Sequence, residues 1–355
     1  MEQIREKIHN GQRLSDEDAL RLFESFDLLG IGELAAQVNK RKNGNKVYFN
    51  VNRHINYTNL CVNQCTFCAF AREGGDERGY TLDLDQIRAK AREAVAAGAT
   101  EIHSVGGLHP ELPFDFYLEM LHAIKEESPT LHIKAFTAVE IDYFARISGK
   151  TLIDVVRELK EAGLGSMPGG GAEILGRQVR DKICPEKISG ERWLEITEIV
   201  HNCGLRTNAT MLFGHLEGYA DRVEHLRLLR QLQDRTGGFQ SFIPLAFQPD
   251  NTRVPGAAGV SGVDALKTLA ISRLYLDNFQ HIKAYWVMLG LKIAQVALCF
   301  GVNDIDGTVI EEKIGHDAGA DSPQVLTREQ LITLIRNAGR QPVERDTLYR
   351  EIREY

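Results

Sequence analysis

Three cysteines lie close together in the first quarter of the chain. Cys61, Cys65 and Cys68 fall within eight residues, and the other three cysteines are scattered. Three thiolates on one short loop can ligate three irons of a four-iron cluster. No fourth cysteine lies nearby, so one iron of such a cluster stays open to an outside ligand. An open iron can bind the amino and carboxylate groups of a sulfonium compound and pass it one electron.

A structural zinc site is the main alternative interpretation of this loop. Structural zinc takes four closed ligands, usually arranged as two pairs. The fourth ligand here must come from Cys184, Cys203, Cys299 or a distant histidine. The hypotheses from other classes are a non-enzymatic barrel stabilised by zinc and an electron-transfer protein, although a plain electron-transfer cluster also normally has four cysteines.

The composition of the 355-residue chain restricts the classes of function. Apolar residues make up 43% and charged residues 26%, a balance typical of globular proteins. A formal net charge of −7 argues against binding to duplex DNA, which needs clustered Lys and Arg. We find no apolar run long enough to span a membrane and no signal peptide in MEQIREKIHN. We therefore expect a cytoplasmic protein without nucleic-acid or membrane partners.

The order of the predicted elements indicates an α/β barrel. Residues 1–45 are polar and helix-prone, with Ser15 and Asp18 spaced nearly as in a capping box. From residue 46 onward, short apolar runs alternate with amphipathic helical patterns, as in a (β/α)8 TIM-type barrel. An incomplete barrel of about six strands, with the tail packed outside, is the alternative. The eight predicted strands are residues 47–52, 101–105, 131–136, 164–167, 207–213, 241–247, 282–286 and 297–302.

We expect three regions along the chain. Residues 1–45 form an N-terminal helical extension, residues 46–304 the barrel, and residues 305–355 a C-terminal helical cap packed on the barrel. Asp83 and Gln86 are placed to cap the helix that follows the first barrel strand. In a barrel the strand-to-helix loops share one face, and such enzymes place their chemistry there.

Several polar and glycine-rich segments follow predicted strands and so belong to that face. The glycine run 169–171 lets the backbone approach an anion or a sugar, although a tight turn without a ligand explains it equally well. His215, beside Glu217, can bind a carboxylate or move a proton, or it is a structural, hydrogen-bonded histidine. Asp304 and Asp306 offer acid–base or hydroxyl-binding groups, but a turn stabilised by Asp side chains is an equal explanation.

The spacing C-x3-C-x-Phe-C after a first barrel strand resembles the cluster loop of the radical S-adenosylmethionine superfamily. The resemblance implies a [4Fe-4S] cluster on the three cysteines and reductive cleavage of S-adenosyl-L-methionine to a 5′-deoxyadenosyl radical. It also places Phe67 near the adenine, and Gly106 and Gly107 near the methionine amino group. Leu108 stands where the superfamily commonly has Glu, so we expect only backbone contacts there.

The resemblance extends to the branch that makes menaquinone and deazaflavin precursors. It rests on NLCVNQCTFCAFAR, HSVGGLHPELPFDFY, SMPGGGAEI, ATMLFGHLE, RTGGFQSFIPLAFQPDNT and FGVNDIDGTVIEEKIGHDAGA. It implies a transferase of the futalosine pathway that adds the radical to 3-[(1-carboxyvinyl)oxy]benzoate, with rearrangement and decarboxylation to 6-amino-6-deoxyfutalosine. S-adenosyl-L-methionine is then consumed, and an electron donor such as flavodoxin or ferredoxin is needed. A sister cyclase acting on dehypoxanthine futalosine shares part of these motifs and is the alternative.

The implied substrate carries two carboxylates, so cationic or amide groups should meet it. The candidates are Arg78, His215, Arg222 and the backbone N–H groups of the glycine run. Glu140 follows the third predicted strand, where a carboxylate can accept two hydrogen bonds from the ribose diol. A surface carboxylate is the alternative for Glu140. The remaining candidates for cofactor binding are Ser166, Gly169, Gly170 and Gly171.

Overall fold

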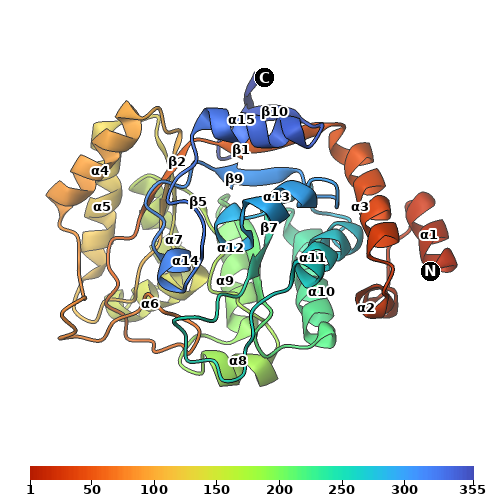
Figure 1. Ribbon diagram of the computed structural model, residues 1–355. Coiled ribbons are helices and arrows are strands. Elements are labelled where there is room, and N and C mark those ends of the chain that lie inside the picture. Colours follow the sequence, from red (N-terminus) through yellow and green to blue (C-terminus); the bar gives the residue numbers. More distant parts are fainter.

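Residues 1–355 are described by a computed structural model, in which seven parallel strands curl around a common interior (Figure 1). The strands follow one another across the sheet in chain order, and every neighbouring pair is parallel. This arrangement is an α/β barrel of the TIM type, as the alternation of elements predicts. The strands are β2 (Asn52–Ile55), β3 (Glu101–Ser104), β4 (His132–Ala135), β5 (Leu164–Met167), β6 (Arg206–Phe213), β7 (Phe239–Ala246) and β8 (His281–Ile282).

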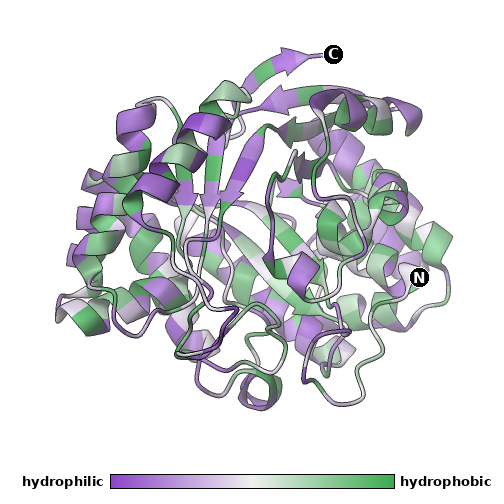
Figure 2. Ribbon diagram, turned by 60° about the vertical axis from the view of Figure 1, so that its left-hand side comes forward, coloured by the Kyte–Doolittle hydropathy of each residue, from purple (hydrophilic) through white to green (hydrophobic).

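Helices cover the outside of this sheet, and Figure 2 shows hydrophilic and hydrophobic residues alternating along them. In α4, Asp83 and Gln86 form both bonds of a capping box, which confirms the predicted helix start. Ile87 and Ala91 of the same helix are fully buried against the barrel. The helices are α4 (Leu84–Ala96), α5 (Phe114–Glu127), α6 (Ala138–Ser148), α7 (Leu152–Glu161), α8 (Arg177–Ile183), α9 (Gly190–Asn202), α10 (Tyr219–Thr236), α11 (Gly262–Tyr275), α12 (Trp286–Leu289) and α13 (Leu291–Ala297).

A second, four-stranded sheet lies beside the barrel and joins distant parts of the chain. Its order is β11-β10-β1-β9, with β1 parallel to both neighbours and β11 antiparallel to β10. The edge strand β9 (Asp304–Gly307) and the residues after it also contact the barrel. Isolated bridges join Asp304 to Lys283 and Ile310 to Arg53. Residues 304–310 thus stand between β8 and β2. The strands are β1 (Lys46–Asn50), β9 (Asp304–Gly307), β10 (Gln341–Arg345) and β11 (Glu351–Glu354).

Three of the predicted strands are placed wrongly. The run 282–286 is a strand only at its start, because β8 ends at Ile282 and α12 begins at Trp286. The run 47–52 was expected to be one barrel strand, but β1 ends at Asn50 and pairs in the small sheet, while β2 begins at Asn52 and opens the barrel. The run 297–302 is not a strand, because α13 ends at Ala297 and β9 begins only at Asp304. The errors at 282–286 and 297–302 arise where apolar residues pack equally well in a helix, a turn or a strand. The run 47–52 is divided because its two halves pair with different strands.

Both ends of the chain pack on the barrel. The predicted capping box of Ser15 and Asp18 is present, and a single cluster of 85 buried apolar residues includes the N-terminal helices. The last fifty residues are not only helical, since they also contain β10 and β11; the division into three regions stays a prediction. No helix has the length and apolar character to cross a membrane. The remaining helices are α1 (Glu2–His9), α2 (Asp16–Glu24), α3 (Leu28–Asn43), α14 (Ile314–Asp317) and α15 (Arg328–Asn337).

Candidate active site

The cysteine loop joins β2 to α4 and lies at the carboxyl end of the barrel strands. Cys61, Cys65 and Cys68 are all free thiols; Cys65 is buried and the other two are half-buried. Burial raises the pKa of the Cys65 thiol to about 12. The Leu108 backbone N–H, from the loop after β3, lies 3.3 Å from Cys61 Sγ and donates to it. The loop is therefore held against the neighbouring strand-to-helix loop.

Packing explains why glycine occupies the next loop. A side chain at Gly107 would overlap the Leu60 carbonyl, and one at Gly106 would lie 2.6 Å from the Tyr57 ring. The Gly107 N–H donates to Thr58 O at 2.9 Å, so this group already has a partner inside the protein. The predicted contact of these glycines with a methionine amino group stays a prediction, and their carbonyls are the groups left to make it.

Glu140 is a buried carboxylate with several protein donors. It accepts hydrogen bonds from Tyr57 Oη at 2.7 Å, from Thr137 N at 2.7 Å and from Gly106 N at 3.3 Å. Burial raises its pKa, while these hydrogen bonds oppose that rise. Glu140 therefore caps α6 and ties it to the loop after β3. It is not a surface carboxylate, and its contact with a ribose stays a prediction.

The glycine run after β5 has the properties of a ligand cradle. Gly169 has a φ of +81°, and a side chain there would overlap the Asn208 carbonyl. None of the three backbone N–H groups of residues 169–171 donates a hydrogen bond within the protein. Unpaired backbone donors in one loop form a concavity that suits an anion or a sugar hydroxyl. Ser166, predicted nearby, instead lies inside the barrel with its hydroxyl 2.8 Å from His132 Nε2.

Arg180 holds the glycine loop in place, a role that no local sequence pattern indicates. Its guanidinium donates to the carbonyls of Ala172 at 2.6 Å, Gly171 at 3.1 Å and Ile188 at 2.7 Å, while the side chain is 2% exposed. A buried guanidinium bound to several carbonyls fixes a loop that has no regular structure of its own. The arginine lies on α8, and only its spatial position reveals this role.

Three residues after β6 that were expected to be catalytic form a closed network. His215 Nε2 donates to Leu212 O at 3.0 Å, while its Nδ1 accepts from Leu216 N at 2.7 Å, so both nitrogens are used. Glu217 is fully buried and pairs with Arg222 at 2.8 Å. Burial lowers the pKa of His215. The structure thus favours the structural alternative for His215.

Two predicted cations do not face the barrel interior. Arg222 lies between Glu217 and Asp264, with 2.8 Å to each carboxylate, and so joins α10 to α11. Arg78 has a side chain that is 73% exposed and pairs with Asp76 at 3.0 Å. Neither position brings the guanidinium to the glycine loop.

The two aspartates of β9 also differ from expectation. Asp304 begins the strand, at the end away from the cysteine loop, and pairs with Arg345 of β10 at 2.7 Å. Asp306 lies 3.1 Å from Lys283 and has a φ of +68°. Opposite charges hold its pKa below the ordinary value despite burial. Lys283 also lies 3.9 Å from Asp304, so buried cations neutralise both carboxylates, and an acid–base role for the pair stays a prediction.

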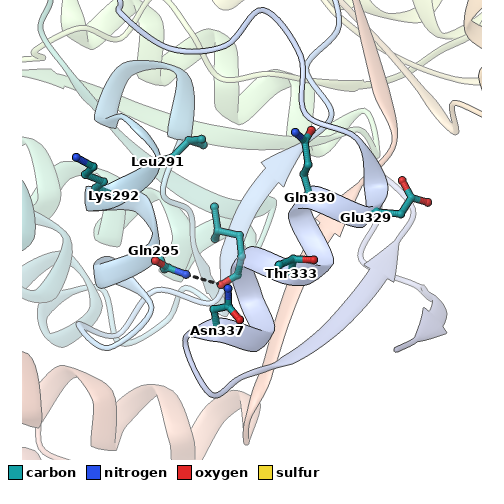
Figure 3. A pocket seen from close by; sticks show the side chains of 8 residues that line it. Leu291, Lys292, Gln295, Glu329, Gln330, Thr333 and Asn337 are labelled. Carbon is teal, nitrogen blue, oxygen red and sulfur yellow. Dashed lines mark hydrogen bonds between the residues drawn. The ribbon is translucent and has the colours of Figure 1, made fainter.

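A separate hollow of about 390 Å³ lies between α13 and α15 (Figure 3). Gln295 of α13 donates to the carbonyl of Leu334 of α15 at 2.9 Å across it. None of its lining residues belongs to the loops at the carboxyl ends of the strands, so it is no part of the candidate site. Nowhere in the chain do three His, Cys, Asp or Glu side chains gather to hold a single metal ion.

Comparison with known proteins decides the family. Residues 55–229 match the radical SAM superfamily, and residues 236–355 match the CofH/MqnC C-terminal region. Aminodeoxyfutalosine synthase of Thermus thermophilus is 49% identical over 354 residues, covering 99% of this chain and 95% of the relative. The chain belongs to the radical SAM superfamily. It is therefore an enzyme of the radical SAM type, from the branch that the sequence motifs indicate.

Other radical SAM relatives carry different activities. The 5-amino-6-(D-ribitylamino)uracil–L-tyrosine 4-hydroxyphenyl transferase of Methanococcoides burtonii is 41% identical over 361 residues, covering 99% of each chain. The hydrogenase maturase HydG of Carboxydothermus hydrogenoformans shares the fold, with a TM-score of 0.77, 18% identity and coverage of 98% of this chain and 80% of its own.

Radical SAM membership implies a [4Fe-4S] cluster and S-adenosylmethionine, and the residues present fit both groups. Three free thiols lie on one loop at the carboxyl ends of the strands. The glycine run adds donors that have no protein partner. Lys187 Nζ, 4.9 Å from the centre of the Phe67 ring, links the cysteine loop to the segment after α8.

Proposed function

We propose that this enzyme is an aminodeoxyfutalosine synthase. The observation that carries the proposal is the 49% identity that extends over nearly the whole of both chains. The motifs IPLAFQPDNT and DIDGTVIEEKI, which resemble the synthase rather than the sister cyclase, support the same choice. When bound, the cluster and S-adenosylmethionine supply a 5′-deoxyadenosyl group that adds to 3-[(1-carboxyvinyl)oxy]benzoate and, after rearrangement and loss of a carboxylate, gives 6-amino-6-deoxyfutalosine.

The chain's own residues have distinct parts in this proposal. Cys61, Cys65 and Cys68 hold three irons and leave the fourth open. The unpaired N–H groups of residues 169–171 bind polar oxygens of the nucleoside or of the methionine carboxylate. Glu140 keeps the loop after β3 against α6, because it accepts from donors in both segments.

One incubation tests the proposal. The protein is reconstituted anaerobically with iron and sulfide and given S-adenosylmethionine, dithionite and 3-[(1-carboxyvinyl)oxy]benzoate. Mass spectrometry should detect 6-amino-6-deoxyfutalosine, with consumption of S-adenosylmethionine in equal amount. Parallel incubations contain dehypoxanthine futalosine, or tyrosine with 5-amino-6-(D-ribitylamino)uracil. Turnover in one of these, and none with the enol ether, would assign the chain to the corresponding relative instead.

Metal analysis distinguishes a zinc site from an iron–sulfur cluster on the cysteine loop. About four irons per chain and a brown colour that dithionite bleaches are the expected result for the cluster. One zinc per chain and no visible absorption band would contradict it. Reversible reduction without any cleavage of S-adenosylmethionine would instead favour an electron-transfer protein.

A further inference from the structure

The interior of the barrel is lined by polar side chains from neighbouring strands. Paired positions of parallel strands face the same side of a sheet. The residues that alternate with this polar row, such as Ile102 and Ile133, belong to the hydrophobic core outside the sheet. The paired positions across β2, β3, β4 and β5 are occupied by His54, His103, Lys134 and Ser166.

The charged groups around this row are already neutralised. Each carboxylate that acts electrostatically on His54 has a nearby cation. With these pairs formed, the protein's own charges around the row are balanced, and a ligand there takes its polar contacts from uncharged donors. The pairs are Lys134 with Glu101 at 2.6 Å, Lys283 with Asp306 at 3.1 Å and His316 with Glu312 at 3.1 Å.

Two imidazoles in the row have no partner. The rings of His54 and His103 are stacked, with centroids 4.3 Å apart and planes inclined by 10°. His54 Nε2 and His103 Nδ1 are buried without a hydrogen bond, whereas His201, His215 and His225 each bond through both ring nitrogens. Buried polar atoms almost always have partners. Two unpartnered nitrogens on adjacent rings therefore mark a position where a bound ligand supplies the missing hydrogen-bond partners.

The state of the two rings defines the ligand's chemistry. Burial lowers the pKa of both histidines, so both are neutral near pH 7. A neutral imidazole carries one N–H donor. With the proton on the unpartnered nitrogen of each stacked ring, the two rings can offer two donors, which suits the two oxygens of a carboxylate.

We propose that His54 and His103 bind the ring carboxylate of the substrate inside the barrel, an inference that rests on the proposed function. The enol-ether end of that substrate must lie at the strand ends that carry the cysteine loop, because its double bond reacts there. The two histidines lie within β2 and β3, on the interior side of those strand ends. The opposite end of the same molecule, which bears the ring carboxylate, reaches them.

The experiment compares two ligands on the reconstituted holoenzyme with S-adenosylmethionine and no reductant, so that nothing turns over. Isothermal titration calorimetry measures Kd for 3-[(1-carboxyvinyl)oxy]benzoate and for 2-phenoxyacrylate, which lacks the ring carboxylate. His103→Phe keeps a stacked ring and removes both nitrogens. It should weaken binding of the benzoate by about 10- to 100-fold, the range expected for losing a hydrogen bond to a charged group. Binding of 2-phenoxyacrylate should stay unchanged.

Control variants make the outcome specific. His54→Phe should reproduce the selective loss, while His132→Gln, which changes a partnered imidazole of the same barrel, should leave the ratio of the two Kd values unchanged. His103→Gln keeps a hydrogen-bond donor and should recover part of the affinity for the benzoate. It takes the place of His103→Phe if that variant fails to fold. An equal loss for both ligands overturns the carboxylate assignment. If the wild type binds neither ligand, the proposed function fails, and this inference fails with it.

Discussion

Arg222 shows how the surroundings of a side chain decide its task. A lone guanidinium after a barrel strand is a natural candidate for binding a carboxylate ligand. In the structure the ligands of Arg222 are two carboxylates of the protein itself, Glu217 and Asp264. Arg78, the other candidate, is mostly exposed and pairs with Asp76. The same residue type thus has two structural environments here, neither of which faces the glycine loop.

Replacing Arg222 by Met should destabilise the protein strongly. The variant leaves the fully buried carboxylate of Glu217 without its cation, which typically costs about 3–5 kcal/mol. Urea unfolding followed by circular dichroism measures the change. Arg78→Ala is the matched control and should leave the unfolding midpoint where it is. Equal midpoints for the two variants would show that the buried pair contributes nothing.

Replacing Cys65 by Ala should abolish cluster assembly while the barrel stays folded. Two thiolates remain on the loop, too few to hold three irons. Iron content after anaerobic reconstitution and the far-ultraviolet circular dichroism spectrum measure the two effects. Cys203→Ala, a half-buried cysteine far along the chain, should retain full iron content. Loss of iron from the Cys203 variant, or turnover by the Cys65 variant, contradicts the ligand assignment.

Local spacing made some residues predictable and left others out of reach. The cysteine loop and the capping box of Asp83 could be predicted, because all their members lie within a few residues of one another. Arg222 and Asp304 could not, because their partners lie 42 and 41 residues away. Arg180, His54 and His103 lacked a signal for a related reason. Their roles depend on which carbonyls or rings the fold brings beside them.

At the scale of elements, the junction of β1 and β2 shows the same limit. Residues 46–55 are one nearly continuous run of strand-forming residues, interrupted only at Val51. The division into two sheets depends on β10 and β9, which pair with the first half of the run. No local sequence pattern indicates that the two halves of one run pair with strands of different sheets. The alternation of strands and helices still indicated the α/β barrel, because that alternation is itself local.

The segment around α14 should become less stable as pH rises. Glu312 accepts a hydrogen bond from His316 and raises the pKa of His316 from 6.5 to about 9. A raised pKa in the folded state contributes stability that is complete below pH 6.5 and is lost as pH rises through 9. Urea unfolding at pH 6 and pH 9.5 should show this loss in the wild type and a smaller one in His316→Asn. An equal loss of unfolding free energy between pH 6 and pH 9.5 in the two proteins would refute the contribution of this pair.

At the scale of the molecule, the C-terminal residues pack closely against the barrel rather than forming an appendage. Arg345 of β10 is buried, pairs with Asp304 at 2.7 Å and lies over the Tyr349 ring at 4.1 Å. Tyr349 in turn stacks on His281 of β8, with ring centroids 3.7 Å apart. The end of the chain therefore closes the interior opposite the cysteine loop.

Deleting residues 341–355 should abolish the fold rather than remove a module. The deletion leaves Asp304 buried without its cation and exposes one edge of β1. Soluble yield and a cooperative thermal transition measure the result. Deleting only residues 351–355, which form the exposed edge strand β11, should retain both. A folded, cooperative product from the longer deletion would show that the cap is a separate domain.

The position of β1 between β10 and β9 also governs when the protein can fold. Lys46 pairs with Gln341, so the two partners are separated by about 300 residues of chain. Such distant pairings form late and slow folding. During synthesis, β1 has both edges open until β9 is made and one edge open until β10 is made, and open strand edges invite pairing with other chains. The small sheet therefore forms only after residues 341–345 are made, and a chain interrupted before them yields an aggregation-prone intermediate instead of a smaller working enzyme.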